Sequence, residues 1–112
     1  MLPAAHRLRA SSDFTEVLRR GRRAGRPTLT VHLSAGVGEG PPRAGLVVSK
    51  AVGGSVVRHQ VARRLRHQLA PIVRDLPAGT RLVVRAAPAA AAADSLALAA
   101  DLRSALSRLT RP

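Results

Sequence analysis

Apolar and polar residues alternate along residues 28–34, and this alternation is the first clear pattern in the chain. The two sets of side chains point to opposite faces, with Leu29, Val31 and Leu33 on one and Thr30, His32 and Ser34 on the other. Such alternation is typical of a half-buried strand. Residues 43–50 and 80–87 hold short apolar runs bounded by turn residues, so we predict two more strands there.

Three other segments repeat their apolar residues with the period of an α-helix. The first is predicted to begin at Ser12 or Asp13 as N-cap and to end at Gly21. The second begins at Ser55 as N-cap, and Pro71 and Pro77 are expected to end it. Asp94 or Ser95 is expected to cap the third. The apolar faces are, in turn, Phe14, Val17 and Leu18; Val61, Leu65, Leu69 and Ile72; and Leu98, Leu102, Ala105, Leu106 and Leu109.

The length of 112 residues fits one domain with a modest core. We expect residues 1–11 to form an N-terminal arm and residues 12–109 the folded core. Residues 36–42 are rich in turn residues and are interpreted as a hairpin loop. Residues 19–26 are interpreted as a basic loop that is either a solvated charge run or a second, non-specific RNA contact.

Charge changes this picture, because the formal net charge is +13 and Lys50 is the only lysine among 19 basic residues. Such a field favours a polyanionic partner, and arginine suits bidentate phosphate contact. The chain has no cysteine, which excludes disulfides and cysteine zinc sites. We find no secretory signal or membrane-spanning run, and therefore expect a cytoplasmic protein without a membrane partner.

The second helix carries its cations in an unusual place. Lys50 precedes the first turn and Arg58 lies in it, although a helix N-terminus favours anions. His59, Arg63 and Arg66 form a ridge beside the apolar stripe, while Arg64 points elsewhere. A bound anion, most simply a phosphate, would explain the placement. The alternative is a solvated basic face on an ordinary helix.

The stretch from residue 45 to 66 resembles the signature of the bacterial ribonuclease P protein component. The positions that match are Gly45, Val48, Ser49, Lys50, Gly53, Val56, Arg58, Arg63 and Arg66, and those that depart are Ala51, His59, Gln60 and Ala62. A second block resembles the same family through Leu8, Asp13, Phe14, Val17 and Gly21.

This resemblance implies an α+β fold, a small α/β sandwich in the order α-β-β-β-α-β-α with a rare left-handed βαβ crossover. It implies that an RNA subunit with Mg²⁺ removes the 5′ leader of precursor tRNA, while the protein binds both RNAs and holds no cofactor tightly. The residues expected to face the catalytic RNA are Lys50, Arg58, His59, Arg63 and Arg66. A leader cleft would hold Phe14, Leu18 and His32, with further basic contacts at Arg7, Arg9, Arg22 and Arg23.

Other interpretations stay open from the residues alone. Phe14 also fits plain core packing, and His32 fits a surface histidine on a strand. A ribosomal or general RNA-binding protein suits the charge equally well, and a DNA-binding protein is compatible with it. An autonomous nuclease would need clustered carboxylates. The six acidic residues form no near pair, so we expect no catalytic residue, no protein-bound metal and no small-molecule substrate.

Overall fold

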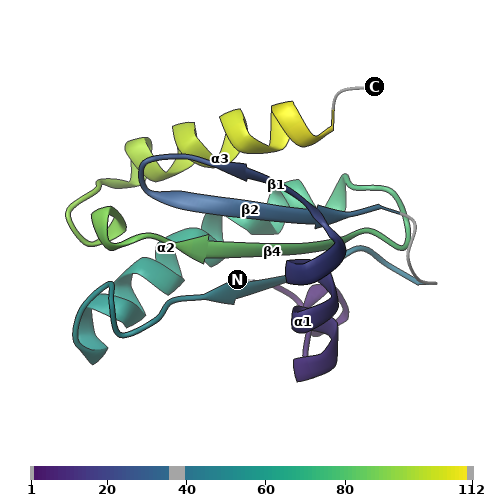
Figure 1. Cartoon of the computed structure of the whole chain (residues 1–112), viewed down its shortest axis with the longest axis horizontal. Helices are drawn as coiled ribbons and strands as arrows, with labels where there is room; N and C mark the ends of the chain where they lie inside the picture. Colours follow the sequence, from purple (N-terminus) through teal and green to yellow (C-terminus); the bar gives the residue numbers. More distant parts are fainter. Residues whose placement is uncertain (1, 36–39, 111–112) are drawn as a thin grey trace.

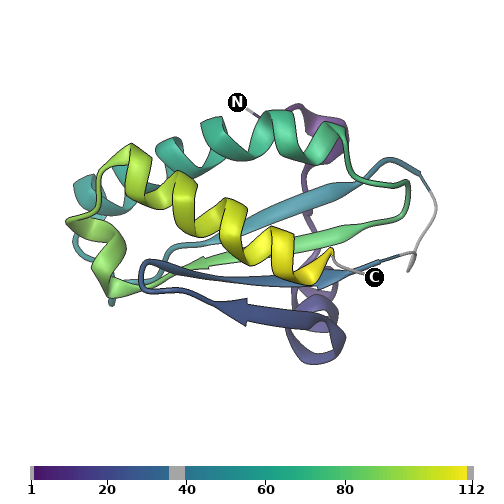
Figure 2. The same cartoon turned by 90° about the horizontal axis from the view of Figure 1, so that it is seen from above.

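The computed structural model describes residues 2–35 and 40–110. A four-stranded sheet has α1 on one face and α2 and α3 on the other (Figures 1 and 2). The order α-β-β-β-α-β-α is the expected one. The elements are η1 Ala4–His6, α1 Ser11–Arg20, β1 Arg22–Gly25, β2 Leu29–Ser34, β3 Arg43–Val47, α2 Ser55–Arg74, β4 Arg81–Ala86, η2 Pro88–Ala91 and α3 Ser95–Leu109.

The sheet is mixed, with strand order β1-β2-β4-β3. The β1–β2 and β2–β4 pairs are antiparallel, whereas β3 and β4 are parallel and α2 connects them. In Figure 1 β3 and β4 point left, β4 lies above β3 and α2 lies behind the sheet, so the crossover is left-handed. Most such connections are right-handed, so the expectation of the rare hand is confirmed.

The main core lies between the sheet and the two long helices. α2 packs over β3, and α3 packs over β1 and β2. The predicted apolar faces of β2 and both helices point into this core, which is aliphatic throughout. Its fully buried members include Leu29, Val31, Val61, Leu65, Leu69, Leu82, Val84, Leu98 and Leu102. Truncating one such leucine to alanine typically costs about 2–5 kcal/mol.

A smaller apolar cluster holds α1 on the opposite face of the sheet. Val17 of α1 is buried together with Leu8 and Val83, and the predicted partners Phe14 and Leu18 pack against them half-buried. The N-terminal arm is also packed, because Leu2 is buried and Arg7 forms an isolated parallel bridge with Ala44. The arm therefore covers the start of β3.

Two predictions about the loops are wrong. The basic stretch 19–26 contains the edge strand β1, which escaped the pattern because only Ala24 of its four residues is buried. The segment 36–42 does not close a hairpin, since β2 and β3 pair with β4 and not with each other. Residues 36–39 of that segment lie outside the described residues.

The expected helix boundaries need correction in three places. α1 begins after Ala10 and α2 after Gly54, and neither end has a side-chain cap, so Ser12, Asp13 and Ser55 are not N-caps. Pro71 lies inside α2, which continues to Arg74 because Val73 is buried in the core. Asp94 does cap α3, where its Oδ1 accepts a hydrogen bond of 2.8 Å from the Ala97 N–H.

Gly21 is required where α1 turns into β1, and this can be tested. A Cβ atom there would lie 2.5 Å from the Val17 carbonyl oxygen and 3.0 Å from that of Leu33. Because both obstacles are backbone, we expect Gly21→Ala to lower the free energy of unfolding by about 2 kcal/mol or more in urea titrations. Gly25→Ala is the matched control, since its Cβ would meet only Thr30 Oγ1 at 3.8 Å. Equal stability of the two variants would contradict this prediction.

Candidate nucleic-acid interface

Burial of the apolar stripe fixes which side of α2 faces solvent. Val61, Leu65 and Leu69 point into the core, and the predicted basic residues lie on the accessible side of the helix or just before it. Lys50, His59, Arg63 and Arg66 are exposed, while Arg58 is half-buried. Within residues 2–35 and 40–110 none of these five side chains forms an ion pair or hydrogen bond. Their charges are therefore available to an external anion.

Three of the five converge on one shallow hollow beside the sheet. The hollow measures about 290 Å³, and its lining residues are Leu46, Val48, Arg58, His59, Ala62 and Arg66. The Nε atom of Arg58 is buried and has no hydrogen-bond partner among the described residues. Lys50 and Arg63 do not line this hollow. Arg64 does point elsewhere, because its Nη1 donates to the Ala93 carbonyl at 3.2 Å.

The start of α2 has cations where a helix usually has acidic residues, as the sequence indicated. Its first turn holds no acidic residue, and its N-cap is Gly54, which has no side chain to bond the first N–H groups. Val56 in that turn is 70% exposed, so the turn projects from the body of the protein. The free N–H groups and the nearby cations favour anions.

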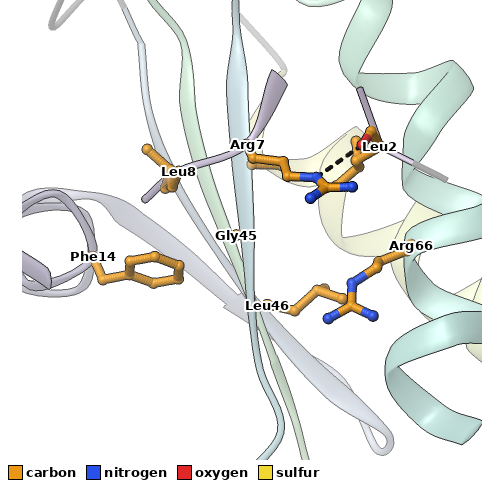
Figure 3. Close-up of a pocket in the computed structure, with 8 residues that line it drawn as sticks. Leu2, Arg7, Leu8, Phe14, Gly45, Leu46 and Arg66 are labelled. Atoms are coloured by element: carbon orange, nitrogen blue, oxygen red, sulfur yellow. Dashed lines mark hydrogen bonds between the residues drawn. The ribbon is translucent and has the colours of Figure 1, made fainter. Parts of the chain in front are cut away.

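A larger hollow of about 420 Å³ lies around the outer edge of β3. Its lining residues are Leu2, Arg7, Leu8, Phe14, Ala44, Gly45, Leu46 and Arg66. Figure 3 shows Phe14 of α1 on one side of the strand and Arg66 of α2 on the other. A Cβ atom at Gly45 would collide with the Phe14 ring, so glycine allows the ring to lie on the strand.

The expected leader residues are not brought together in this hollow. Phe14 lines it, half-exposed, whereas Leu18 packs beside Val17 and does not. His32 is 4% exposed, so the interpretation as a surface histidine is wrong. His32 lies on the sheet face on which α1 packs, between Arg23 of β1 and Val83 of β4.

His32 is a buried imidazole in a basic setting. Neither ring nitrogen has a hydrogen-bond partner in the described part of the chain. Burial, followed by the positive charges of Arg85 and Arg23, lowers the pKa of His32 below its ordinary value of 6.5. The imidazole is therefore neutral at pH 7.

The remaining predicted cations separate into two groups. Arg22 faces the α3 side, where its Nη1 donates to the Leu109 carbonyl at 3.0 Å, and the Nε of Arg7 donates to the Leu2 carbonyl at 2.9 Å. Arg9 and Arg23 are exposed without such contacts among the described residues. Arg85, which the list of candidates omitted, is exposed on the same sheet face as Arg23. The alternation of side chains along β4 places Arg85 on this face, and knowing where β1 lies would have identified it as a neighbour of Arg23 and a candidate RNA contact.

The described residues offer no group of three His, Asp or Glu side chains that could hold a metal ion. Among the described helices, none has the length and apolar character needed to cross a membrane.

Comparison with known proteins gives consistent results. The family model for ribonuclease P matches residues 2–110. The ribonuclease P protein component of Streptomyces bikiniensis is 56% identical, covering 97% of this chain and 95% of that relative. The ribonuclease P protein component of Rhodococcus jostii is 53% identical, covering 97% of this chain and 92% of that relative.

Solved structures share the fold. The RNase P protein of Staphylococcus aureus matches with a TM-score of 0.83 at 21% identity, covering 95% of this chain and 96% of that one. The RNase P protein of Thermotoga maritima, in complex with 1-(4-fluorophenyl)-2-thiourea, matches with a TM-score of 0.76 at 22% identity. The match covers 95% of this chain and 99% of that one.

The buried imidazole predicts a pH-dependent stability. Below pH 6.5 the unfolded chain takes up a proton at His32 that the folded chain resists, so stability is lost as the pH falls toward the lowered pKa. We expect the unfolding free energy of the wild type to drop relative to His32→Gln between pH 7.5 and 5, by at most about 1.4 kcal/mol per pH unit. Exposed His67→Gln is the control. Parallel pH profiles for wild type and His32→Gln would contradict the prediction.

Proposed function

This chain belongs to the ribonuclease P protein family, and on that premise we propose that it binds the ribonuclease P RNA and the 5′ leader of precursor tRNA. In this role it assists the RNA-catalysed, Mg²⁺-dependent removal of the leader. The observation that carries the proposal is the open basic side of α2, whose cations have no protein partners among the described residues.

The basic side of α2 suits a folded RNA. Exposed arginines contact phosphates through paired N–H groups, and each contact releases counterions from the RNA. Arg58 and His59 lie on one turn and Arg63 on the next turn of a helix whose rotation is fixed by the core. We assign this side of α2, together with Lys50, to the ribonuclease P RNA. Arg66 lies at its border, because it lines both hollows.

The opposite face of the sheet suits a single strand. Phe14 is the only Phe, Tyr or Trp residue of the chain, and Arg23 and Arg85 are exposed on the sheet face on which α1 packs. Aromatic rings and arginines are the usual partners of unpaired bases and their backbone. Leu18 and His32 support this surface from beneath, so we assign the leader contacts to Phe14, Arg23 and Arg85.

The placement of the two surfaces supports a bridging role. α1 and α2 lie on opposite faces of one sheet, so the surfaces point in different directions (Figures 1 and 2). One protein can then hold the leader while it is docked on the catalytic RNA. Its positive charge would screen phosphate repulsion between the two RNAs, and so raise the affinity of the complex for Mg²⁺.

Bond cleavage is assigned to the RNA subunit. Mg²⁺ prefers carboxylate and other oxygen ligands, and the described residues provide no cluster of acidic side chains. The described residues therefore do not fit a resident Mg²⁺ ion, which we assign to the RNA. Its own residues bind and position RNA, and none is proposed to move a proton or act as a nucleophile.

The decisive test is reconstitution with the cognate ribonuclease P RNA. We expect the protein to restore leader cleavage at Mg²⁺ concentrations at which the RNA alone is inactive. No stimulation would overturn the proposal in favour of general RNA binding. Cleavage by the protein alone would instead indicate an autonomous nuclease.

The α2 assignment predicts a change in salt dependence. Arg63→Ala should weaken binding of the ribonuclease P RNA and reduce the slope of log K against log salt by about 0.7–0.9, the value for one lost phosphate contact. Arg103→Ala is the control of equal charge change, because Arg103 is exposed on α3. An unchanged slope for Arg63→Ala, measured by filter binding, would show that this side of α2 is only solvated.

The leader assignment predicts a loss of discrimination. Phe14→Leu keeps an apolar side chain but removes the ring, so the preference for precursor over mature tRNA should fall by about 1–3 kcal/mol per stacked base. The measurement is the ratio of dissociation constants of the reconstituted enzyme for the two RNAs. Equal losses on both RNAs would point to a folding defect, which urea titration of the variant would reveal.

A further inference from the structure

The outer edge of β3 is only partly covered. Arg7 bridges to Ala44, and the Leu8 N–H donates to the Ala44 carbonyl at 2.9 Å. Beyond this point the arm turns away into α1. The second half of β3 is therefore an open strand edge within the described part of the fold, at the edge of the sheet opposite β1.

The main-chain groups of Leu46 face this opening. The Arg43 N–H donates to the Thr80 carbonyl at 2.9 Å, so Arg43 and every second residue after it turn toward β4. Ala44 and Leu46 consequently turn outward. The Ala44 carbonyl is used by Leu8, whereas the N–H and carbonyl of Leu46 have no partner within residues 2–35 and 40–110. Unpaired strand edges readily accept further hydrogen bonds.

The surroundings of Leu46 select what can bind there. The hollow of about 420 Å³ is within the size range of small-molecule sites. Figure 3 shows the Phe14 ring on one side of the strand and the Arg66 guanidinium on the other, with Arg7 near the upper end. The Arg66 side chain has no ion pair or hydrogen bond with described residues. The site thus combines an aromatic ring, a main-chain donor and acceptor, and a free cation.

We propose that this hollow holds one unpaired nucleotide of the leader. The base edge bonds to the N–H and carbonyl of Leu46, the base packs against Phe14, and Arg66 binds the phosphate. Gly45 has no side chain to obstruct this approach. The inference rests on the proposed function, and it moves Arg66 from the catalytic RNA to the substrate.

The chemistry favours a nucleotide over an added peptide strand. Both could bond to Leu46, but the free guanidinium and the net charge of +13 favour a phosphate-bearing ligand. Every base offers a neighbouring donor and acceptor, so the contact tolerates any leader sequence. A paired base has already used these groups, so the site selects single-stranded leaders.

An abasic scan of the leader tests the proposal. Single abasic nucleotides are placed at each leader position, and kcat/KM of the reconstituted enzyme is measured in competition with unmodified precursor. We expect a loss of about fivefold or more at one position and less than about twofold elsewhere, from the lost stacking and hydrogen bonds. The ribonuclease P RNA alone at high Mg²⁺ is the control, because the effect must require the protein.

Two variants connect the sensitive position to the hollow. Arg66→Gln removes the cation from an exposed site, and Gly45→Ala displaces the Phe14 ring from the strand. Both should lower kcat/KM for the unmodified precursor and abolish the additional loss at the sensitive position. Arg103→Gln should leave that loss unchanged. If Gly45→Ala fails to fold, Arg66→Gln alone still tests whether the sensitive position depends on the hollow.

The outcomes separate this inference from the proposed function. A flat abasic scan, with wild-type protein still restoring cleavage at low Mg²⁺, overturns the nucleotide site and leaves the proposed function standing. A sensitive position that persists in Arg66→Gln and Gly45→Ala also overturns it. The inference is also overturned if Arg66→Gln weakens the binding of ribonuclease P RNA alone as much as it weakens the binding of precursor tRNA. The nucleotide in the hollow would then belong to the catalytic RNA.

Discussion

Burial of the aliphatic stripe of α2 against the sheet is the interaction on which the rest of the structure depends. Val61, Leu65 and Leu69 set the rotation of the helix about its axis, and the rotation decides where every cation on it points. The described residues form no ion pairs that would neutralise these cations. Apolar burial must therefore offset the mutual repulsion of a chain with net charge +13, which an RNA partner would relieve.

The left-handed crossover places α2 and its cations on the face of the sheet opposite α1. α2 joins two adjacent parallel strands from behind the sheet, while α1 covers part of the front. The two faces of a thin sheet thereby bear different chemistry: arginines on a rigid helix on one side, and an aromatic ring with a partly open sheet on the other. The outer edge of β3 lies where the two meet, which is why Arg66 and Phe14 share one hollow.

Periodicity predicted the parts of the fold that bury one continuous apolar face. β2, α2 and α3 belong to this group, because their stripes are long enough to be distinguished from chance. β1 could not be found, since an edge strand with one buried alanine carries no alternation. The burial of His32 was also missed, because it depends on neighbours from other elements, including Arg23 of β1 and Val83 of β4. The side of α2 that bears the cations followed from helical geometry, whereas the family resemblance, and not the pattern, supplied the crossover hand and the leader cleft.

The scarcity of aromatic residues supports a role for main-chain groups in the nucleotide site proposed at the β3 edge. Single-strand binding usually relies on successive aromatic rings, and here Leu18 stands one turn after Phe14 where a second ring would extend the platform. With one ring, the remaining affinity for a base must come from arginine and from hydrogen bonds. A strand edge provides such bonds without any side chain, and Gly45 keeps it accessible. Because these groups bond equally well to every base, the proposed nucleotide site would distinguish an unpaired leader from a paired one more than it would distinguish one leader sequence from another.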